Sequence, residues 1–433
     1  MTPPAPPAPA PPLSPALSPT ARVPVRVAYD PLVRFRRKIA QNAQGWLDFL
    51  QEALAQQDSN AQDSSTQDSS TAEAEFANLY KAAQQALAEP SAWAEGLALV
   101  EAMWPLVSVR GFWLEWGDLL GRAQGVAQGQ DCPSTEARLL DQRGELARFL
   151  GEAAQAKALQ SQALALFRQI GDDEGTGRVL NHLSQAHMTL GEHSPAQACC
   201  QEAAAIFQRT GNQAELAQAH LRWGLVSAEL TQWDEALVHH RTAADLFIEF
   251  GDVGGQAKAL NNQGHVLRMQ EQWPQAITTF EQAIAMHTAA GDEINAARSR
   301  VNLGIVYDSL GDPQQALLLH REVEPLFRRL GDRPWLARVL NNQGVFLRGL
   351  GQPDAAAHAF TQAVTLHLQN GNRAYAAMTL LTLAGLWIKL GEFELAKGPL
   401  GEAEELLAGL SHPPEREVGR LREMVGVVRQ SDG

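Results

Sequence analysis

The chain has 433 residues, of which 45% are hydrophobic and 19% are charged, a composition that excludes wholesale disorder and supplies a large buried core. Lys and Arg number 35 against 49 Asp and Glu, and the formal charge of −14 argues against nucleic-acid and anionic-membrane partners for the molecule as a whole. The three cysteines are too few for a disulfide framework, and with neither a long apolar run nor a basic-then-apolar leader we expect a cytoplasmic protein.

Two low-complexity segments occur near the N-terminus. Residues 1–28 include ten prolines in the first 24 positions, and because proline fixes φ and lacks an amide donor, this segment is expected to be a disordered, extended tail. Docking to an SH3-like partner is the alternative to a plain solvated tail. Residues 57–71 contain the tandem sequence QDSST-QDSST, whose composition cannot bury enough apolar surface to fold, so we expect a loop between helices.

The rest of residues 29–136 is expected to form an N-terminal helical region, because apolar residues recur at three and four positions and β-branched residues are few. Residues 95–127 are in phase with the repeats described below and are expected to form a degenerate lead-in hairpin. Five of the ten tryptophans fall in this region, where they are expected to form the core of a helical cap; the alternative is an aromatic docking surface. They are Trp46, Trp93, Trp104, Trp113 and Trp116.

A glycine followed by Asp or Asn recurs every 40 residues. Glycine is suited to the left-handed position that ends one helix, and the Asp or Asn side chain can cap the free amides that open the next helix. Each pair therefore predicts a joint between two helices. The pairs begin at Gly171, Gly211, Gly251, Gly291, Gly331 and Gly371.

A second set of small residues keeps the same step, at Gly144, Ser184, Gly224, Gly264, Gly304, Gly344 and Ala384, with an alanine twelve residues after each. Small side chains at these positions allow two antiparallel helices to approach closely. Each unit is therefore expected to be a helical hairpin. Its turn falls at a glycine in five repeats, but at Thr231 and Glu271 in the other two.

These offsets resemble the tetratricopeptide repeat (TPR), most clearly in LNNQGHVL (260–267), AITTFEQA (276–283) and VNLGIVY (301–307). Leucine replaces the early tryptophan of that family, Gly-Asp or Gly-Asn replaces its closing proline, and the period is 40 rather than 34, as in the long-helix branch of kinesin light chains and of the helical sensor regions of bacterial signalling ATPases. The resemblance covers residues 137–410 as seven repeats and implies an all-α, right-handed helical-hairpin solenoid (a TPR superhelix) with an N-terminal helical cap. Residues 411–433 are expected to supply a C-terminal capping helix and tail.

The sequence contains no catalytic or nucleotide-binding motif: GxxxxGK[ST], HExxH, GxSxG and CxxC are all absent. His239 and His240 are adjacent on a predicted helix and point in different directions, which is poor geometry for a metal. Cys200 falls at a core position of its repeat. We therefore expect no enzyme activity, no cofactor and no metal.

A polar stripe runs along the first helix of each repeat, beside the buried stripe of small and apolar residues. In the TPR family this stripe lines the concave groove, where Asn and Lys or Arg at matching positions hold the backbone and carboxylates of a bound peptide. The resemblance therefore implies a peptide-binding groove. Its residues are Arg178, Asn181 and His182; Lys258, Asn261, Asn262 and His265; Arg298 and Asn302; and Arg338, Asn341 and Asn342.

Five repeats carry a basic residue at one position of this stripe, namely Arg138, Arg178, Lys258, Arg298 and Arg338. Such a row would attract acidic side chains or a chain terminus. The asparagines add donors and acceptors for an extended backbone, and asparagine is a mediocre helix former in the absence of a partner. The alternative is an ordinary solvated face whose charges pair with neighbouring acids.

We expect a non-catalytic scaffold or adaptor that binds an extended, acidic peptide segment of another protein. The alternative is a regulatory sensor that responds to a peptide or small molecule, resembling quorum-peptide receptors, with the N-terminal bundle as its output. RNA binding is opposed by the charge and by the lack of groove aromatics. The oligomeric state is left open, and the excess of arginine over lysine, 29 to six, is typical of a GC-rich bacterial source.

Overall fold

The structure is a computed structural model that describes residues 38–46, 48, 69–110, 113–410 and 413–431. The expected tail at 1–28 lies outside these residues, and so does the expected loop at 57–71 as far as residue 68. The last three residues of that loop instead open helix α2, which begins at Ser69. Ser70 followed three residues later by Glu73 is a typical helix start, and this local signal accounts for the earlier end of the loop.

The described chain is helical throughout, and no strand occurs among the described residues. A helical segment at 38–46 precedes α2 (Ser69–Ala88), α3 (Trp93–Arg110) and α4 (Trp113–Gly129). Seven hairpins follow in the described residues: α5 (Pro133–Phe149) with α6 (Ala153–Ile170), α7 (Asp173–Thr189) with α8 (His193–Thr210), α9 (Gln213–Glu229) with α10 (Trp233–Glu249), α11 (Val253–Met269) with α12 (Trp273–Ala289), α13 (Glu293–Ser309) with α14 (Pro313–Leu330), α15 (Arg333–Gly349) with α16 (Pro353–Gln369), and α17 (Arg373–Lys389) with α18 (Phe393–Ala408). The last helix is α19 (Glu415–Ser431).

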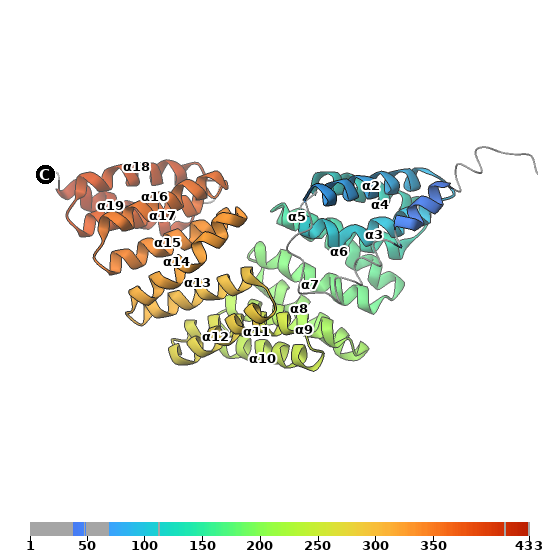
Figure 1. Ribbon diagram of the computed structural model, residues 1–433, viewed down its shortest axis with the longest axis horizontal. Coiled ribbons are helices and arrows are strands. Elements are labelled where there is room, and N and C mark those ends of the chain that lie inside the picture. Colours follow the sequence, from blue (N-terminus) through green and yellow to red (C-terminus); the bar gives the residue numbers. More distant parts are fainter. Residues whose placement is uncertain (1–37, 47, 49–68, 111–112, 411–412, 432–433) are drawn as a thin grey trace, which may run out of the picture.

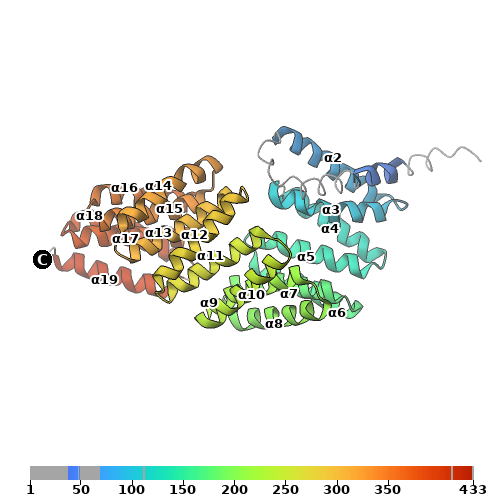
Figure 2. The ribbon, with the colours of Figure 1, turned by 60° about the horizontal axis from the view of Figure 1, so that its bottom comes forward.

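The hairpins follow one another around an arc, with α2–α4 at one end and α18 and α19 at the other (Figure 1). Turning the molecule shows that the arc also rises out of one plane (Figure 2). From α5 to α15 the first helices of successive hairpins contact one another, whereas the second helices make no comparable contact with each other in the described chain. The first helices (odd-numbered, α5 to α17) are therefore the inner helices of the curve, and the second helices are the outer ones. The predicted all-α, right-handed hairpin solenoid with an N-terminal helical cap is confirmed.

Each hairpin is held by close contact between a small residue of the inner helix and a large side chain of the outer helix. A Cβ atom added to Gly264 would lie 2.9 Å from the ring of Phe280, and one added to Gly344 would lie 2.6 Å from the ring of Phe360. Both rings are fully buried. The absence of a Cβ thus brings the two helices into contact through a ring that lies flat against the inner backbone.

The predicted joints between hairpins are present. All six joint glycines have positive φ, and the Asp or Asn that follows accepts a hydrogen bond from a backbone amide of the next helix at five of the six joints. Asp172, for example, accepts from the amide of Gly175 at 2.8 Å. Asn372 is the exception and makes no side-chain cap. Because every joint has the same length, the phase of the inner helices is preserved from one repeat to the next.

The N-terminal helices share one apolar core with the start of the repeats. Trp116 is fully buried in it, and Trp46, Trp93 and Trp113 pack against it partly exposed. These four tryptophans therefore belong to the core of the cap, as predicted, while the side chain of Trp104 lies outside the described set. At the other end α19 packs Leu421 and Val428 into the core formed with α17 and α18.

Two hairpin turns test the cost of a side chain in the left-handed region. Thr231 and Glu271 have φ of 59° and 58°, where the other repeats have glycine. A non-glycine residue there costs about 1 kcal/mol. We expect Glu271→Gly to raise the urea midpoint, measured by circular dichroism, by an amount equivalent to about 0.5–1 kcal/mol. The control is Glu281→Gly, on an exposed position inside α12, which should lower the midpoint by about 1 kcal/mol; a lower midpoint for Glu271→Gly would contradict the interpretation.

Candidate peptide-binding groove

All twelve predicted groove residues lie on inner helices. Arg178, Lys258 and Arg338 are exposed. Seven others are partly buried: His182, Asn261, Asn262, His265, Arg298, Asn341 and Asn342. Asn181 and Asn302 differ from the expectation, because their side chains are only 2% and 9% exposed and are out of reach of a ligand in this conformation.

Two of the asparagines join neighbouring repeats. The Oδ1 atom of Asn261 accepts hydrogen bonds from the Ser299 hydroxyl at 3.0 Å and from Asn302 Nδ2 at 3.2 Å. One arc further, Asn341 Oδ1 accepts from the Thr379 hydroxyl at 3.2 Å. In both cases the hydroxyl comes from the same position of the next inner helix. These asparagines therefore have a partner inside the fold, which the sequence pattern alone did not reveal.

Asn181 occupies the same position in its repeat but has no such partner. Both polar atoms of its amide are buried without a hydrogen bond, because Ala219 stands where Ser299 and Thr379 stand in the later repeats. A buried polar group without a partner costs about 1–3 kcal/mol. The first joint between α7 and α9 thus lacks the hydrogen bond that α11 and α15 make with their successors.

Supplying the missing hydroxyl should stabilise the chain. We expect Ala219→Ser to raise the free energy of unfolding by about 0.5–1.5 kcal/mol, since the new hydroxyl can donate to Asn181 Oδ1. The measurement is urea denaturation followed by circular dichroism. In an Asn181→Leu background the serine should bring no gain, and an equal gain in both backgrounds would rule out the proposed bond.

A charged network lies on the inner surface of α5 and α7. His182 Nδ1 lies 2.9 Å from Asp141 Oδ1, and Glu145 pairs with Arg148 at 3.0 Å. Burial disfavours the charged imidazole, but the carboxylates of Asp141 and Glu145 outweigh burial and raise the pKa of His182. Acids and bases are therefore neutralised internally at this end of the groove.

The basic row is neutralised unevenly. Arg138 pairs with Glu101 at 2.9 Å, whereas Arg178 and Lys258 form no ion pair or hydrogen bond within the described part of the chain. Arg298 lies 3.8 Å from Asp332 Oδ2. Arg338 has no acidic partner among the described residues, and its guanidinium lies over the ring of Trp335 at 4.9 Å. The middle and C-terminal repeats thus present cations that the protein itself leaves unpaired.

A cluster of neutral histidines occupies the middle of the solenoid. His220 Nδ1 and His239 Nδ1 are 3.0 Å apart, and His239 stacks on Trp223 with ring centroids 3.9 Å apart. His240 is fully buried against Gly224, and both of its ring nitrogens lack partners. Burial is the first cause that lowers the pKa of His220 and His239 to about 4 and of His240 to about 3. The pairing of His220 with His239 could not be read from the sequence, because the two residues belong to different helices.

His240 stands where two other repeats have Phe280 and Phe360, so His240→Phe should fit against Gly224 and remove two unpartnered nitrogens. Because the folded pKa lies below the unfolded value near 6.5, the unfolded chain binds the extra proton, and stability is lost as pH falls from about 6.5 toward 3. We expect the variant to be more stable than wild type in urea at pH 7.5, and its advantage to grow by about 1 kcal/mol at pH 5.5.

The matched control is His320→Phe. His320 also faces a glycine, but its Nδ1 donates to the Ala316 carbonyl at 3.1 Å and its Nε2 lies 3.3 Å from Asn342 Nδ2. Replacement there removes hydrogen bonds, so the variant should gain less than His240→Phe at pH 7.5. Equal gains at the two positions would show that the unpartnered nitrogens of His240 carry no cost.

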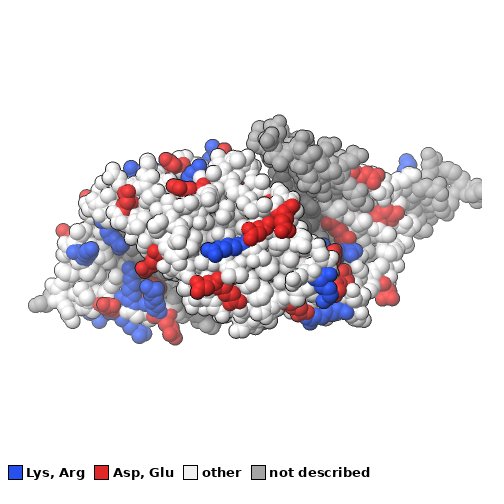
Figure 3. Space-filling model, turned by 90° about the horizontal axis from the view of Figure 1, so that it is seen from below, with Lys and Arg blue, Asp and Glu red and all other residues white. Residues whose placement is uncertain are grey.

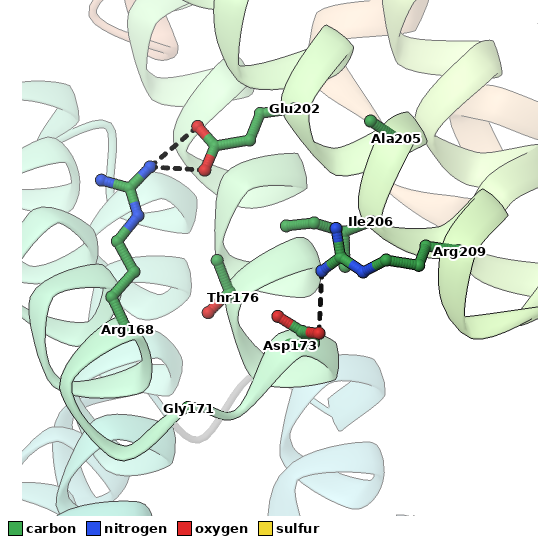
Figure 4. Close-up of a pocket in the computed structure, with 8 residues that line it drawn as sticks. All are labelled: Arg168, Gly171, Asp173, Thr176, Glu202, Ala205, Ile206 and Arg209. Atoms are coloured by element: carbon green, nitrogen blue, oxygen red, sulfur yellow. Dashed lines mark hydrogen bonds and ion pairs between the residues drawn. The ribbon is translucent and has the colours of Figure 1, made fainter.

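The best-formed cavity outside the groove lies between the outer part of the second hairpin and its neighbour and measures about 270 Å³ (Figure 4). Two ion pairs span it, Arg168 with Glu202 at 2.6 Å and Arg209 with Asp173 at 2.8 Å. Its charges are therefore satisfied by the protein itself, and it offers a ligand less than the groove does.

The outer surface carries mixed charge. Seen from the side of α10 and α12, basic and acidic side chains are interspersed, with wide uncharged areas between them (Figure 3). Among the described residues no group of three or more His, Cys, Asp or Glu side chains is arranged to hold a metal ion. Within the same part of the chain no helix is long and apolar enough to cross a membrane.

A model of the tetratricopeptide repeat family matches residues 135–209, 215–289 and 255–329. No curated protein matches the chain. A Rap protein complexed with Competence and Sporulation Factor aligns with a TM-score of 0.58 and 13% identity over 90% of this chain and 99% of its own. The apo form of the quorum sensor NprR from B. thuringiensis aligns with a TM-score of 0.56 and 13% identity over 85% of this chain and 99% of its own.

A signal transduction ATPase with numerous domains and a tetratricopeptide repeat sensor, from Pyrococcus horikoshii, aligns with a TM-score of 0.55 and 14% identity over 82% of this chain and 55% of its own. At such identities the likeness concerns the fold alone. The hairpins with a 40-residue period, their glycine and alanine positions and the matching family model agree with it. The chain is therefore a tetratricopeptide repeat protein.

Proposed function

We propose that the chain is a non-catalytic interaction protein whose groove binds an extended, acidic peptide segment of another protein. The observation that carries the proposal is the row of unpaired cations on the inner helices. Arg178 and Lys258 have no partner in the described chain, and Arg338 has no acidic one. In a protein of net charge −14, cations without a counter-ion on a concave face favour an acidic ligand.

The amides beside this row suit a peptide backbone. Asn262 lies partly buried on the inner face of α11 and makes no hydrogen bond within the described chain. Its amide offers a donor and an acceptor to an extended segment without reading its side chains. Asn341 and Asn342 each spend one polar atom inside the fold, at Thr379 and His320, and keep the other atom of the amide available.

The second candidate function is a ligand-responsive regulator. The fold is shared with the quorum sensor NprR and with a Rap protein solved in complex with Competence and Sporulation Factor. A regulator of this kind changes shape when its ligand binds, whereas an adaptor stays nearly rigid. The radius of gyration measured by X-ray scattering with and without bound peptide separates the two, because only the regulator should become more compact.

The test of the groove uses the full chain to select from a random peptide library and measures the selected peptides by fluorescence anisotropy. We expect peptides rich in Asp and Glu whose affinity falls with added salt. Arg178→Gln combined with Lys258→Gln should weaken binding at least about tenfold, since each lost charge-assisted hydrogen bond is worth about 1.5–3 kcal/mol.

The matched control removes the same charge from the outer helices. Arg241 on α10 and Arg321 on α14 are exposed and unpaired in the described chain, so Arg241→Gln combined with Arg321→Gln changes the net charge equally. This control should bind as wild type does. If both double variants lose affinity alike, the effect comes from overall charge, and the groove is not the binding site.

A further inference from the structure

Two arginines of the groove come together from different repeats with no acid between them. Arg268 lies near the end of α11 and Arg338 near the start of α15. The charge of Arg338 lowers the pKa of both Arg268 and His265, after the larger effect of burial, so these groups lie near one another. Neither guanidinium has a carboxylate partner among the described residues.

Each of these guanidinium groups is held in place by an uncharged neighbour. Arg268 Nη2 lies 3.1 Å from His265 Nε2, and burial lowers the pKa of His265 to about 4, so the neutral imidazole accepts this hydrogen bond at neutral pH. Arg338 lies over the indole of Trp335 at 4.9 Å. A histidine and a tryptophan thus fix the position of the cations without cancelling their charge.

A third arginine lies beside them but is already balanced. The guanidinium of Arg298 lies 5.1 Å from the centre of the same Trp335 ring, and its Nη2 atom lies 3.8 Å from Asp332. The acid on the inner face of α13, Asp308, lies under the influence of Arg348 instead. Two positive charges, those of Arg268 and Arg338, are therefore left without an opposite charge in the described structure.

Two fixed guanidinium groups match one ligand group with two negative charges. A phosphate monoester carries about −1.5 to −2 charges at pH 7 and presents three acceptor oxygens, whereas a carboxylate carries a single charge. Planar guanidinium groups bind phosphate oxygens through paired hydrogen bonds. The desolvation of both cations adds to the benefit, since a partly buried charge without a partner is costly and its neutralisation is correspondingly favourable.

We propose that Arg268 and Arg338 form a phosphate subsite in the groove, oriented by His265 and Trp335, which takes a phosphorylated side chain of the bound segment. The subsite deepens the proposed function and rests on it, because it names the chemistry of one group of the ligand. His265 and Trp335 are positioning residues. The groove between repeats four and six would then prefer a phosphorylated segment over one that is merely acidic.

The test titrates the full chain, uniformly labelled with 5-fluorotryptophan, with inorganic phosphate and separately with acetate, and follows fluorine NMR. The resonance of Trp335 is assigned from its loss in Trp335→Phe. We expect phosphate to shift this resonance and to bind at least tenfold more tightly than acetate. Arg268→Gln and Arg338→Gln should each weaken phosphate binding at least tenfold, while Arg241→Gln combined with Arg321→Gln leaves it unchanged.

The positioning role is tested with His265→Leu, which leaves both arginines in place. Its unfolding midpoint should remain near that of wild type, and its phosphate affinity should fall severalfold, whereas His265→Asn, which can still accept from Arg268, should recover part of it. Phosphate binding that survives Arg268→Gln and Arg338→Gln would overturn the subsite, and so would equal affinity for phosphate and acetate.

The failure of the subsite and the failure of the proposed function give different results. If acidic peptides bind through Arg178 and Lys258 but phosphate produces no shift at Trp335, the peptide groove stands and the phosphate subsite is wrong. If phosphate binds through Arg268 and Arg338 but no selected peptide depends on the groove, the subsite stands and the peptide function is wrong. Two phosphopeptides that differ only by phosphoserine and glutamate at one position then show whether the phosphate belongs to a bound segment.

Discussion

The structure depends on one close contact that recurs in the hairpins, in which the backbone of an inner helix meets a side chain of the outer helix. At Gly264 and Gly344 a phenylalanine ring occupies the space that a Cβ would fill, and at Gly224 and Gly304 an imidazole does. This contact fixes which side of the inner helix is buried. Since the buried side is fixed, the opposite side of the same helix has to face the inside of the curve, and the groove follows from the packing of the hairpin.

The constant period turns that local packing into a long surface. Each joint spends one left-handed glycine and one capping Asp or Asn, and the strict spacing gives every inner helix the same phase. Residues that share a position in the repeat therefore align along the arc. Where a joint or turn departs from the pattern, as at Glu271, the backbone keeps the same conformation at a cost in strain rather than changing the period.

Local order could be predicted from the sequence, and contacts between repeats could not. The Gly-Asp joints, the hairpins and the inner position of residues such as Lys258 follow from spacing, because helix periodicity relates residues a few positions apart. The bond from Ser299 to Asn261 and the pair of His220 with His239 depend on the angle between successive helices, which no short pattern encodes. Asn181 shows the limit most clearly, since its sequence position matches that of Asn261 and only the residue at position 219 distinguishes their surroundings.

The electrostatics of the groove follow from where the protein places its acids. On α5 the inner surface carries Asp141 and Glu145, which take up the charges of His182 and Arg148. From α11 onward the corresponding positions hold amides and apolar residues, and the arginines are oriented by rings instead. An indole or a neutral imidazole can hold a guanidinium but cannot neutralise it, so the field of Arg268 and Arg338 remains directed into the groove. The two ends of one continuous surface therefore differ in what they require of a ligand: the first end is satisfied by the protein itself, and the second is completed only by an anion from outside.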